Sequence, residues 1–177
     1  MQSSDAASAT ADSNSLCKHC GLCCDGTLFF SAKLQPEDNP RALAALGLRI
    51  KRRGGELHML QPCSAWQGGA CAVYHDRPLR CRKFVCRQLQ LLTQNQTTRE
   101  DALEKISQAK NHLAQLLHLL EQAGDSRSQK ALSTRCETLF TEPLELSPEA
   151  IQRRKKVRDL MQKLDSILIR HFRVDED

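Results

Sequence analysis

The chain has few aromatic residues and no long apolar run. It contains one Trp, one Tyr and five Phe among 177 residues. No stretch approaches the roughly 20 apolar residues that a membrane-spanning helix needs. Residues 1–15 are mostly Ser, Ala and Asp and lack the basic segment and apolar run of a secretory signal. We therefore expect a cytoplasmic protein without a membrane partner and a disordered tail over residues 1–15.

Recognisable catalytic patterns are also missing. We find no defensible Ser-His-Asp order, no pair of carboxylates at a useful spacing and no glycine-rich phosphate loop. No residue is therefore assigned a catalytic role, and a non-catalytic protein is the leading interpretation.

Cysteine is the residue type that stands out. Four of the nine cysteines form the pattern C-x2-C-x2-C-C in residues 17–24, and four more follow by residue 86. In a reducing compartment such clusters indicate metal binding or catalysis rather than disulfides. We expect eight thiolates to bind metal: Cys17, Cys20, Cys23, Cys24, Cys63, Cys71, Cys81 and Cys86.

The spacing leaves the metal open. C-x2-C is half of a four-cysteine zinc site, whereas C-x2-C-x2-C is also the three-cysteine run of bacterial [4Fe-4S] ferredoxins. The cofactor is thus zinc or iron, with a [4Fe-4S] cluster as one form. Neighbouring side chains diverge, so one member of the pair Cys23–Cys24 should serve a second centre or a bridging role. His19 is either a further ligand or a solvent-facing spacer.

The excess positive charge lies in the cysteine-rich half. Residues 17–90 contain 12 Lys and Arg against 5 Asp and Glu, whereas residues 91–177 contain 14 of each sign. Cationic side chains would offset the negative charge of metal-bound thiolates and lower the thiol pKa values. A nucleic-acid surface is the alternative, and it also applies to the basic run 153–158.

The second half of the chain has helical periodicity. Thr97 and Glu100 suggest a capping box, Gly124 a helix end, and Ser147-Pro148 the start of a last helix. Two long amphipathic helices predict an antiparallel pair, which could also bind an unknown protein or a second copy of the chain. Before them, Leu79, Arg82, Cys86 and Leu89 recur at helical spacing after Pro78.

We therefore expect a mainly α protein with a small, irregular, metal-organised module that contains minor β structure. The expected boundaries are a tail over 1–15, a cysteine-rich module over 16–92 and a helical region over 97–177. Cys136 lies outside the cysteine pattern, and we expect it to be a small buried apolar residue.

The cysteine pattern resembles a known family. The C-x2-C-x2-C-C run, Pro62-Cys63 and the segment Cys71-x2-Tyr74-x2-Arg77-Pro78-x2-Cys81-Arg82-x-Phe84-x-Cys86 are similar to the CxxCxxCC cysteine-cluster proteins, which are described as zinc- or iron-chelating. The resemblance implies that five further residues support the site: Tyr74, Arg77, Pro78, Arg82 and Phe84. A distantly similar group, the flagellin lysine N-methylases, implies the alternative of an iron-sulfur enzyme or redox protein that transfers methyl groups.

Overall fold

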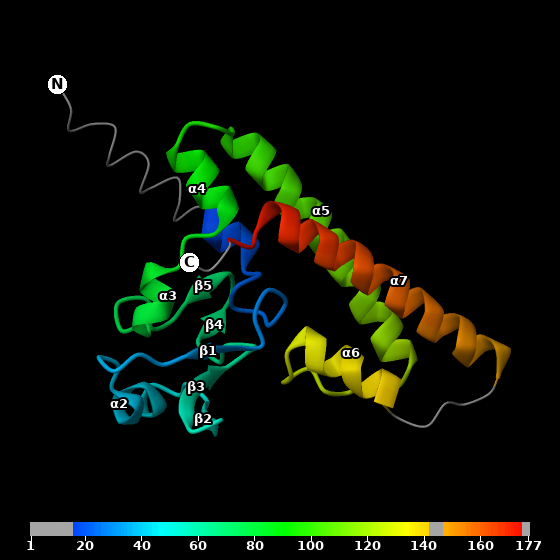
Figure 1. Cartoon of the computed structure of the whole chain (residues 1–177), viewed down its shortest axis with the longest axis horizontal. Coiled ribbons are helices and arrows are strands. Elements are labelled where there is room, and N and C mark those ends of the chain that lie inside the picture. Colours follow the sequence, from blue (N-terminus) through cyan, green and yellow to red (C-terminus); the bar gives the residue numbers. More distant parts are fainter. Residues whose placement is uncertain (1–15, 142–146, 175–177) are drawn as a thin grey trace.

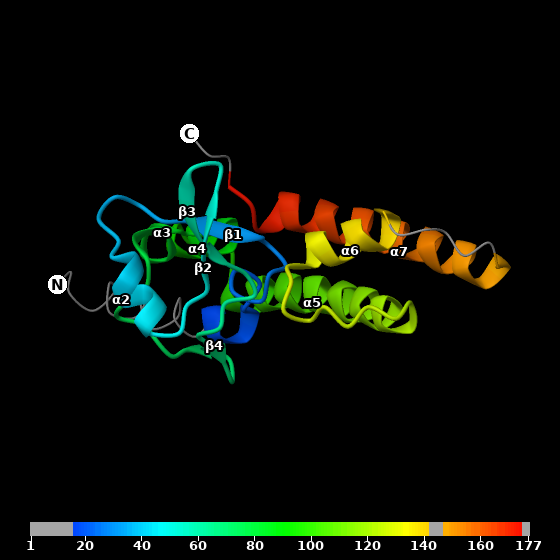
Figure 2. The same ribbon diagram turned by 90° about the horizontal axis from the view of Figure 1, so that it is seen from below.

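The computed structural model describes residues 16–141 and 147–174; the expected tail over 1–15 lies outside the described residues. The chain is mainly α-helical and has two small antiparallel sheets, as predicted (Figure 1). Three helices form a long region that extends to one side of the cysteine-rich module (Figure 2). No helix within the described ranges has the apolar length that a bilayer span needs.

The helical region contains α5 (Arg99–Gln122), α6 (Leu132–Thr141) and α7 (Pro148–His171). Helices α5 and α7 contact each other along their length and run in opposite directions, as the green and orange-red ribbons in Figure 1 show. Helix α6 packs against both. The predicted antiparallel pair is therefore present, with α6 as a third helix.

Helix α5 begins one residue later than its predicted capping box. Thr98, not Thr97, is the N-cap: its hydroxyl accepts a hydrogen bond from the Asp101 amide at 3.1 Å, and the Asp101 carboxylate accepts one from the Thr98 amide at 3.4 Å. The predicted capping box of Thr97 and Glu100 is therefore wrong. Thr97 and Thr98 are equally suitable as N-caps, so the local sequence does not distinguish between them. The sequence alone did not reveal which register buries Ala102 and Ile106.

The helices and the first cysteine loop share one apolar core. Helix α7 starts at Ser147-Pro148 as predicted, with the Ser147 hydroxyl accepting a hydrogen bond from the Ala150 amide at 3.2 Å. Leu16, Leu22 and Leu28 of the cysteine-rich module pack into the core that the helices form. Its most buried helical members include Leu116, Leu120, Val157, Leu164 and Phe172.

The module has a second, smaller core and little regular structure. Its three-stranded sheet has the order β1-β3-β2, from β1 (Ser31–Lys33), β3 (Glu56–Leu60) and β2 (Ile50–Arg53). Helix α2 (Pro40–Ala45) packs against β2. A separate hairpin is formed by β4 (Trp66–Gln67) and β5 (Ala70–Cys71). The buried residues of this core are Leu34, Leu43, Leu48, Met59 and Ala65.

The predicted helix from Pro78 through Leu89 is broken in two. Helix α3 (Leu79–Lys83) ends at Phe84, whose ψ of 122° is extended, and α4 (Arg87–Thr93) begins after Cys86 as its N-cap. Phe84 leaves the helical path and packs edge-on against Phe29, with ring centroids 5.0 Å apart. A tertiary contact therefore overrides the helical spacing.

Candidate metal centre

The first set of cysteines surrounds the start of the module. Residues 16–20 are helical, so Cys17 and Cys20 lie one turn apart, and Cys23 follows in the turn after Gly21. Cys20 and Cys23 pack against the core shared with the helices. The fourth member, Cys86, lies 63 positions after Cys23 in the sequence, at the N-cap of α4.

The start of α4 is held by the last turn of α7. The Arg87 amide donates a hydrogen bond to the Phe172 carbonyl at 3.1 Å, and Gln88 Nε2 donates one to the His171 carbonyl at 2.8 Å. Gln88 is buried despite its polar side chain. The far end of the chain thus fixes the position of Cys86.

The second set is contributed by four separate segments. Cys24 ends the C-x2-C-x2-C-C run, Cys63 follows β3, Cys71 lies in β5 and Cys81 lies in α3. The Cys63 amide donates a hydrogen bond to the Cys24 carbonyl at 2.7 Å, which joins two of these segments. Cys63, Cys71 and Cys81 all pack against the second core rather than the first.

Thiols of the first set raise the pKa values of other thiols in the set. The pKa of Cys20 is raised to about 12, mainly by burial, with the thiols of Cys86 and Cys17 contributing. Burial also raises the pKa of Cys23, again with Cys86 and Cys20 as the main neighbouring thiols. Cys17 is exposed as a residue, yet desolvation of its sulfur and the nearby Cys86 raise its pKa too. These four thiols therefore lie within electrostatic reach of one another.

The other four thiols affect one another in the same way. Burial raises the pKa of Cys24, and Cys63, Cys81 and Cys71 add to the effect. Burial raises the pKa of Cys81 to about 11, with Cys63 and Cys71 contributing. Between the sets, the adjacent thiols Cys23 and Cys24 also interact. Cys23 is thus affected mainly by thiols of the first set and Cys24 by thiols of the second.

Arg77 lies within reach of both sets. Its positive charge lowers the pKa values of Cys17 and of Cys81, against the larger effect of burial at each. The guanidinium lies 3.8 Å from the centroid of the Tyr74 ring, and Nε donates a hydrogen bond to the Tyr74 carbonyl at 2.8 Å. Tyr74 itself is exposed and stacks edge-on with His75. The Tyr-x2-Arg motif thus fixes a cation beside the thiols.

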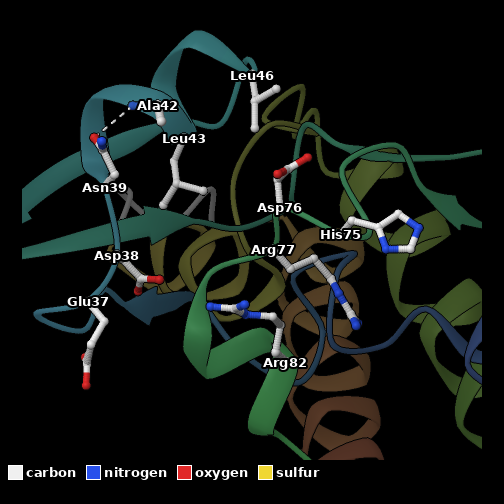
Figure 3. A pocket seen from close by; sticks show the side chains of 10 residues that line it. All are labelled: Glu37, Asp38, Asn39, Ala42, Leu43, Leu46, His75, Asp76, Arg77 and Arg82. Carbon is white, nitrogen blue, oxygen red and sulfur yellow. Dashed lines mark hydrogen bonds between the residues drawn. The ribbon is translucent and has the colours of Figure 1, made fainter.

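A shallow pocket of about 230 Å³ lies beside α3, the helix that carries Cys81, and none of the described cysteines lines it (Figure 3). Arg82 extends from α3 toward the segment that carries Glu37 and Asp38, and Arg77 and Asp76 line the same pocket. Asp38 has a structural role, since its carboxylate accepts hydrogen bonds from the Leu79 amide at the start of α3 and from the Gln35 amide, each at 2.8 Å. Asp38 therefore fixes the helix that carries Cys81.

The remaining residues implied by the family resemblance have separate positions. Pro78 is buried and precedes α3 as its N-cap. Phe84 packs with Phe29 against the helical core. His19 is exposed, and its carbonyl accepts a hydrogen bond from Lys110 Nζ of α5 at 2.7 Å.

Two residues near the cysteines were not predicted from the sequence. Trp66 lies against Gly21, and Asp38 caps the helix of Cys81. A single Trp in a cysteine-rich segment only weakly indicates a residue that packs against the site. The sequence around Asp38 does not indicate its role, because its hydrogen-bond partner Leu79 is 41 residues away.

All nine cysteines are free thiols. Cys136 is fully buried in the helical core, as expected, and takes no part in either set. Within residues 16–141 and 147–174, no three His, Cys, Asp or Glu side chains are already gathered as a cage for one metal ion. The thiols are sorted into two neighbourhoods by their electrostatic effects on one another.

The donor chemistry is that of a soft-metal chelator. Thiolates are preferred ligands of zinc and of iron-sulfur clusters, and eight of the nine described thiols form two sets of four. A sequence model of the family CxxCxxCC, "Putative zinc- or iron-chelating domain", matches residues 16–102. Residues 16–102 are therefore similar to a domain whose description is zinc or iron chelation. No curated protein and no solved structure matches the chain.

The basic run 153–158 lies on α7, away from the cysteines. Arg158 makes a contact within the helical region, because its guanidinium lies 5.3 Å from the centroid of the Phe140 ring. No exposed aromatic ring accompanies this run on α7, so the stacking platform typical of single-strand binding is not part of the described surface there.

Proposed function

We propose that the protein binds zinc or iron in two separate four-cysteine centres. The first centre comprises Cys17, Cys20, Cys23 and Cys86. The second centre comprises Cys24, Cys63, Cys71 and Cys81. The observation that carries the proposal is the sorting of eight thiols into two sets of four by their electrostatic effects on one another. Core packing agrees for five of them, since Cys20 and Cys23 pack against the first core and Cys63, Cys71 and Cys81 against the second.

The chemistry of each set suits a closed centre. Four thiolates fill the tetrahedral shell of a zinc ion and leave no position for substrate. The ligands must be thiolates, so each metal ion would displace protons from the raised-pKa thiols. Arg77 would then offset part of the negative charge at both centres. Such a protein stores, transfers or is stabilised by its metal rather than using it as a hydrolytic catalyst.

The experiment is a metal and acid-labile sulfide count on chain purified without oxygen and without a His-rich tag. The zinc form should contain about two ions per chain, which is what two closed four-thiolate sites hold. Cys20→Ser and Cys81→Ser should each remove one centre and leave the other.

Cys136→Ser is the matched control, because Cys136 is buried in the helical core and belongs to neither centre. It should retain the full metal content. Complete loss of metal from both single ligand variants, with the helices intact, would point to one shared centre and contradict the proposal. So would a chain that binds less than one ion.

A second candidate applies to the first centre alone. Its ligands are a C-x2-C-x2-C run plus one remote cysteine, which is the arrangement that bacterial ferredoxins use for [4Fe-4S] clusters. The second centre has no such run. Brown protein with about four iron and four sulfide per chain, both lost in Cys20→Ser and kept in Cys81→Ser, would support an iron-sulfur centre and turn attention to redox or methyl-transfer chemistry. Absence of sulfide from anaerobic protein would exclude it.

A further inference from the structure

The β4–β5 hairpin joins the two proposed centres. It carries Cys71 of the second centre, which pairs with Trp66 across the hairpin. The Trp66 amide donates a hydrogen bond to the Cys63 carbonyl at 3.0 Å, and the Cys63 amide donates one to the Cys24 carbonyl at 2.7 Å. The backbone of Trp66 is thus fixed to the segments that supply three of the second-centre cysteines.

The indole of Trp66 lies against Gly21, in the segment of residues 17–24 that carries three cysteines of the first centre and is called the first-centre loop below. Gly21 separates Cys20 from Leu22, and a Cβ at Gly21 would lie 2.7 Å from Trp66 Cζ2. Gly69, at the turn of the hairpin, approaches the same loop, since a Cβ there would lie 3.2 Å from the Lys18 carbonyl oxygen. The hairpin therefore contacts the first-centre loop at two points.

Gly21 transmits this contact to cysteines of both centres. Its amide donates to the Cys17 carbonyl at 3.2 Å, and its carbonyl accepts from the Cys24 amide at 2.8 Å. Its φ of +74° is in the left-handed region, which glycine adopts without steric cost. An ordered indole at this position holds the backbone on both sides of Gly21 in one conformation.

We propose that Trp66 couples the two centres, so that metal in either one makes the other bind metal more tightly. This inference rests on the two-centre function proposed above. Metal binding at one centre orders the hairpin or the loop. The second ion then binds to a segment that is already ordered and loses less conformational entropy. Trp66 is a positioning residue and supplies no ligand.

The test is anaerobic titration of the metal-free full chain with Co2+, whose thiolate complexes are coloured, and with Zn2+ in the presence of a competing chelator. Cys20→Ser isolates the second centre and Cys81→Ser isolates the first. Each isolated centre should bind its ion more weakly than in the wild type, by a factor between about 5 and 150. Linkage requires the same factor in both directions.

Trp66→Ala should bring this factor close to one while both centres still bind, and Trp66→Phe should restore part of it. Because the chain has one Trp, indole emission provides a second readout. Zn2+ should shift the emission in Cys20→Ser and in Cys81→Ser alike, although neither filled centre includes Trp66. The helical circular dichroism signal identifies any variant that fails to fold. If Cys20→Ser fails to fold, Cys17→Ser replaces it, and if Cys81→Ser fails to fold, Cys71→Ser replaces it.

The outcomes separate the coupling from the function beneath it. Two ions bound with equal strength in wild type and in the isolated centres would overturn the coupling and leave the two-centre function standing. An unchanged factor in Trp66→Ala would overturn the role of Trp66. A wild-type chain that binds fewer than two Co2+ ions through thiolates would contradict the two-centre function itself.

Discussion

The helical region and the cysteine-rich module bury apolar side chains by different means. Helix α5 alone buries six residues along one stripe, and α6 and α7 cover it. The second core of the module has five buried residues, gathered from short strands and loops. A small core cannot offset the entropy of ordering so many irregular residues without a staple. From this comparison we expect the helices to keep their structure without metal and the module to depend on a staple such as bound metal.

Removal of metal is expected to have the largest effect, confined to the module. Structural zinc contributes roughly 10–16 kcal/mol in small zinc peptides at neutral pH. A chelator under reducing conditions should therefore abolish hydrogen-exchange protection in β2, β3 and the β4–β5 hairpin while α5 and α7 stay protected. Exchange measured by mass spectrometry checks this. Equal loss in both regions would show that they form one cooperative unit.

The next effect tests the helical region through its buried ion pair. The Asp125 carboxylate accepts hydrogen bonds from Arg127 Nε at 2.5 Å and Arg135 Nε at 2.6 Å, and its side chain is 1% exposed. Asp125→Ala removes the carboxylate from Arg135, which is buried, and from Arg127, which is partly exposed, and should lower the free energy of unfolding by about 3–5 kcal/mol.

Urea unfolding followed by circular dichroism measures this loss. Asp165→Ala is the control, because Asp165 pairs with Arg173 at 3.1 Å but is 54% exposed. It should cost about 0–1 kcal/mol. Equal costs for the two variants would contradict a special role of the buried pair.

Deleting a side chain from either core should have a local effect. Leu116 is fully buried in the helical core, and Leu116→Ala should cost about 2–5 kcal/mol of helical stability without changing metal content. Leu43→Ala, in the second core, should instead raise hydrogen exchange in the module. A loss of bound metal in Leu116→Ala would show that the shared core also supports the first centre.

The same Asp125 predicts a pH dependence of the helices. Burial acts to raise its pKa, but the hydrogen bonds from Arg127 and Arg135 outweigh burial and hold the pKa below its usual value. The carboxylate therefore stabilises the fold above the unfolded-state pKa of about 4, and this contribution is lost as pH falls through the lowered pKa. Metal-free chain should melt at a lower temperature at pH 3 than at pH 7, and Asp125→Asn should reduce that difference.

The smallest effect is expected at Cys136. This thiol is fully buried in the helical core, and burial raises its pKa to about 12. Cys136→Ala should cost about 1 kcal/mol, the usual size for a point change, and leave metal content unchanged. Thermal unfolding and metal analysis check both points. A metal deficit would place Cys136 among the ligands.

The sequence predicted regular elements better than irregular ones. The end of α5 near Gly124 and the start of α7 at Ser147-Pro148 follow from local signals that need no partner. The break at Phe84 could not be predicted, because it depends on Phe29, 55 positions earlier. The capping box was placed one residue early because Thr97 and Thr98 are chemically equivalent as caps.

The sequence provides candidate ligands for the site but not their arrangement. Cysteine spacing indicates eight candidate ligands, and the expected divergence of Cys23 and Cys24 indicates either a second centre or a bridging role. Which cysteines belong together depends on tertiary contacts, such as the hydrogen bond between Cys63 and Cys24. The contact of Trp66 with Gly21 had no local signal at all.

The hydrogen bonds that hold α4 to the end of α7 impose an order on biosynthesis. The ribosome makes Cys17, Cys20 and Cys23 early and Cys86 later, but the backbone carbonyls that hold the start of α4 belong to residues translated 83 to 85 positions after their donors. A nascent chain can therefore present three thiols of the first set long before the fourth is held in place. The support of Cys86 therefore waits for α7, and a chain interrupted before this helix lacks the carbonyls that hold the start of α4.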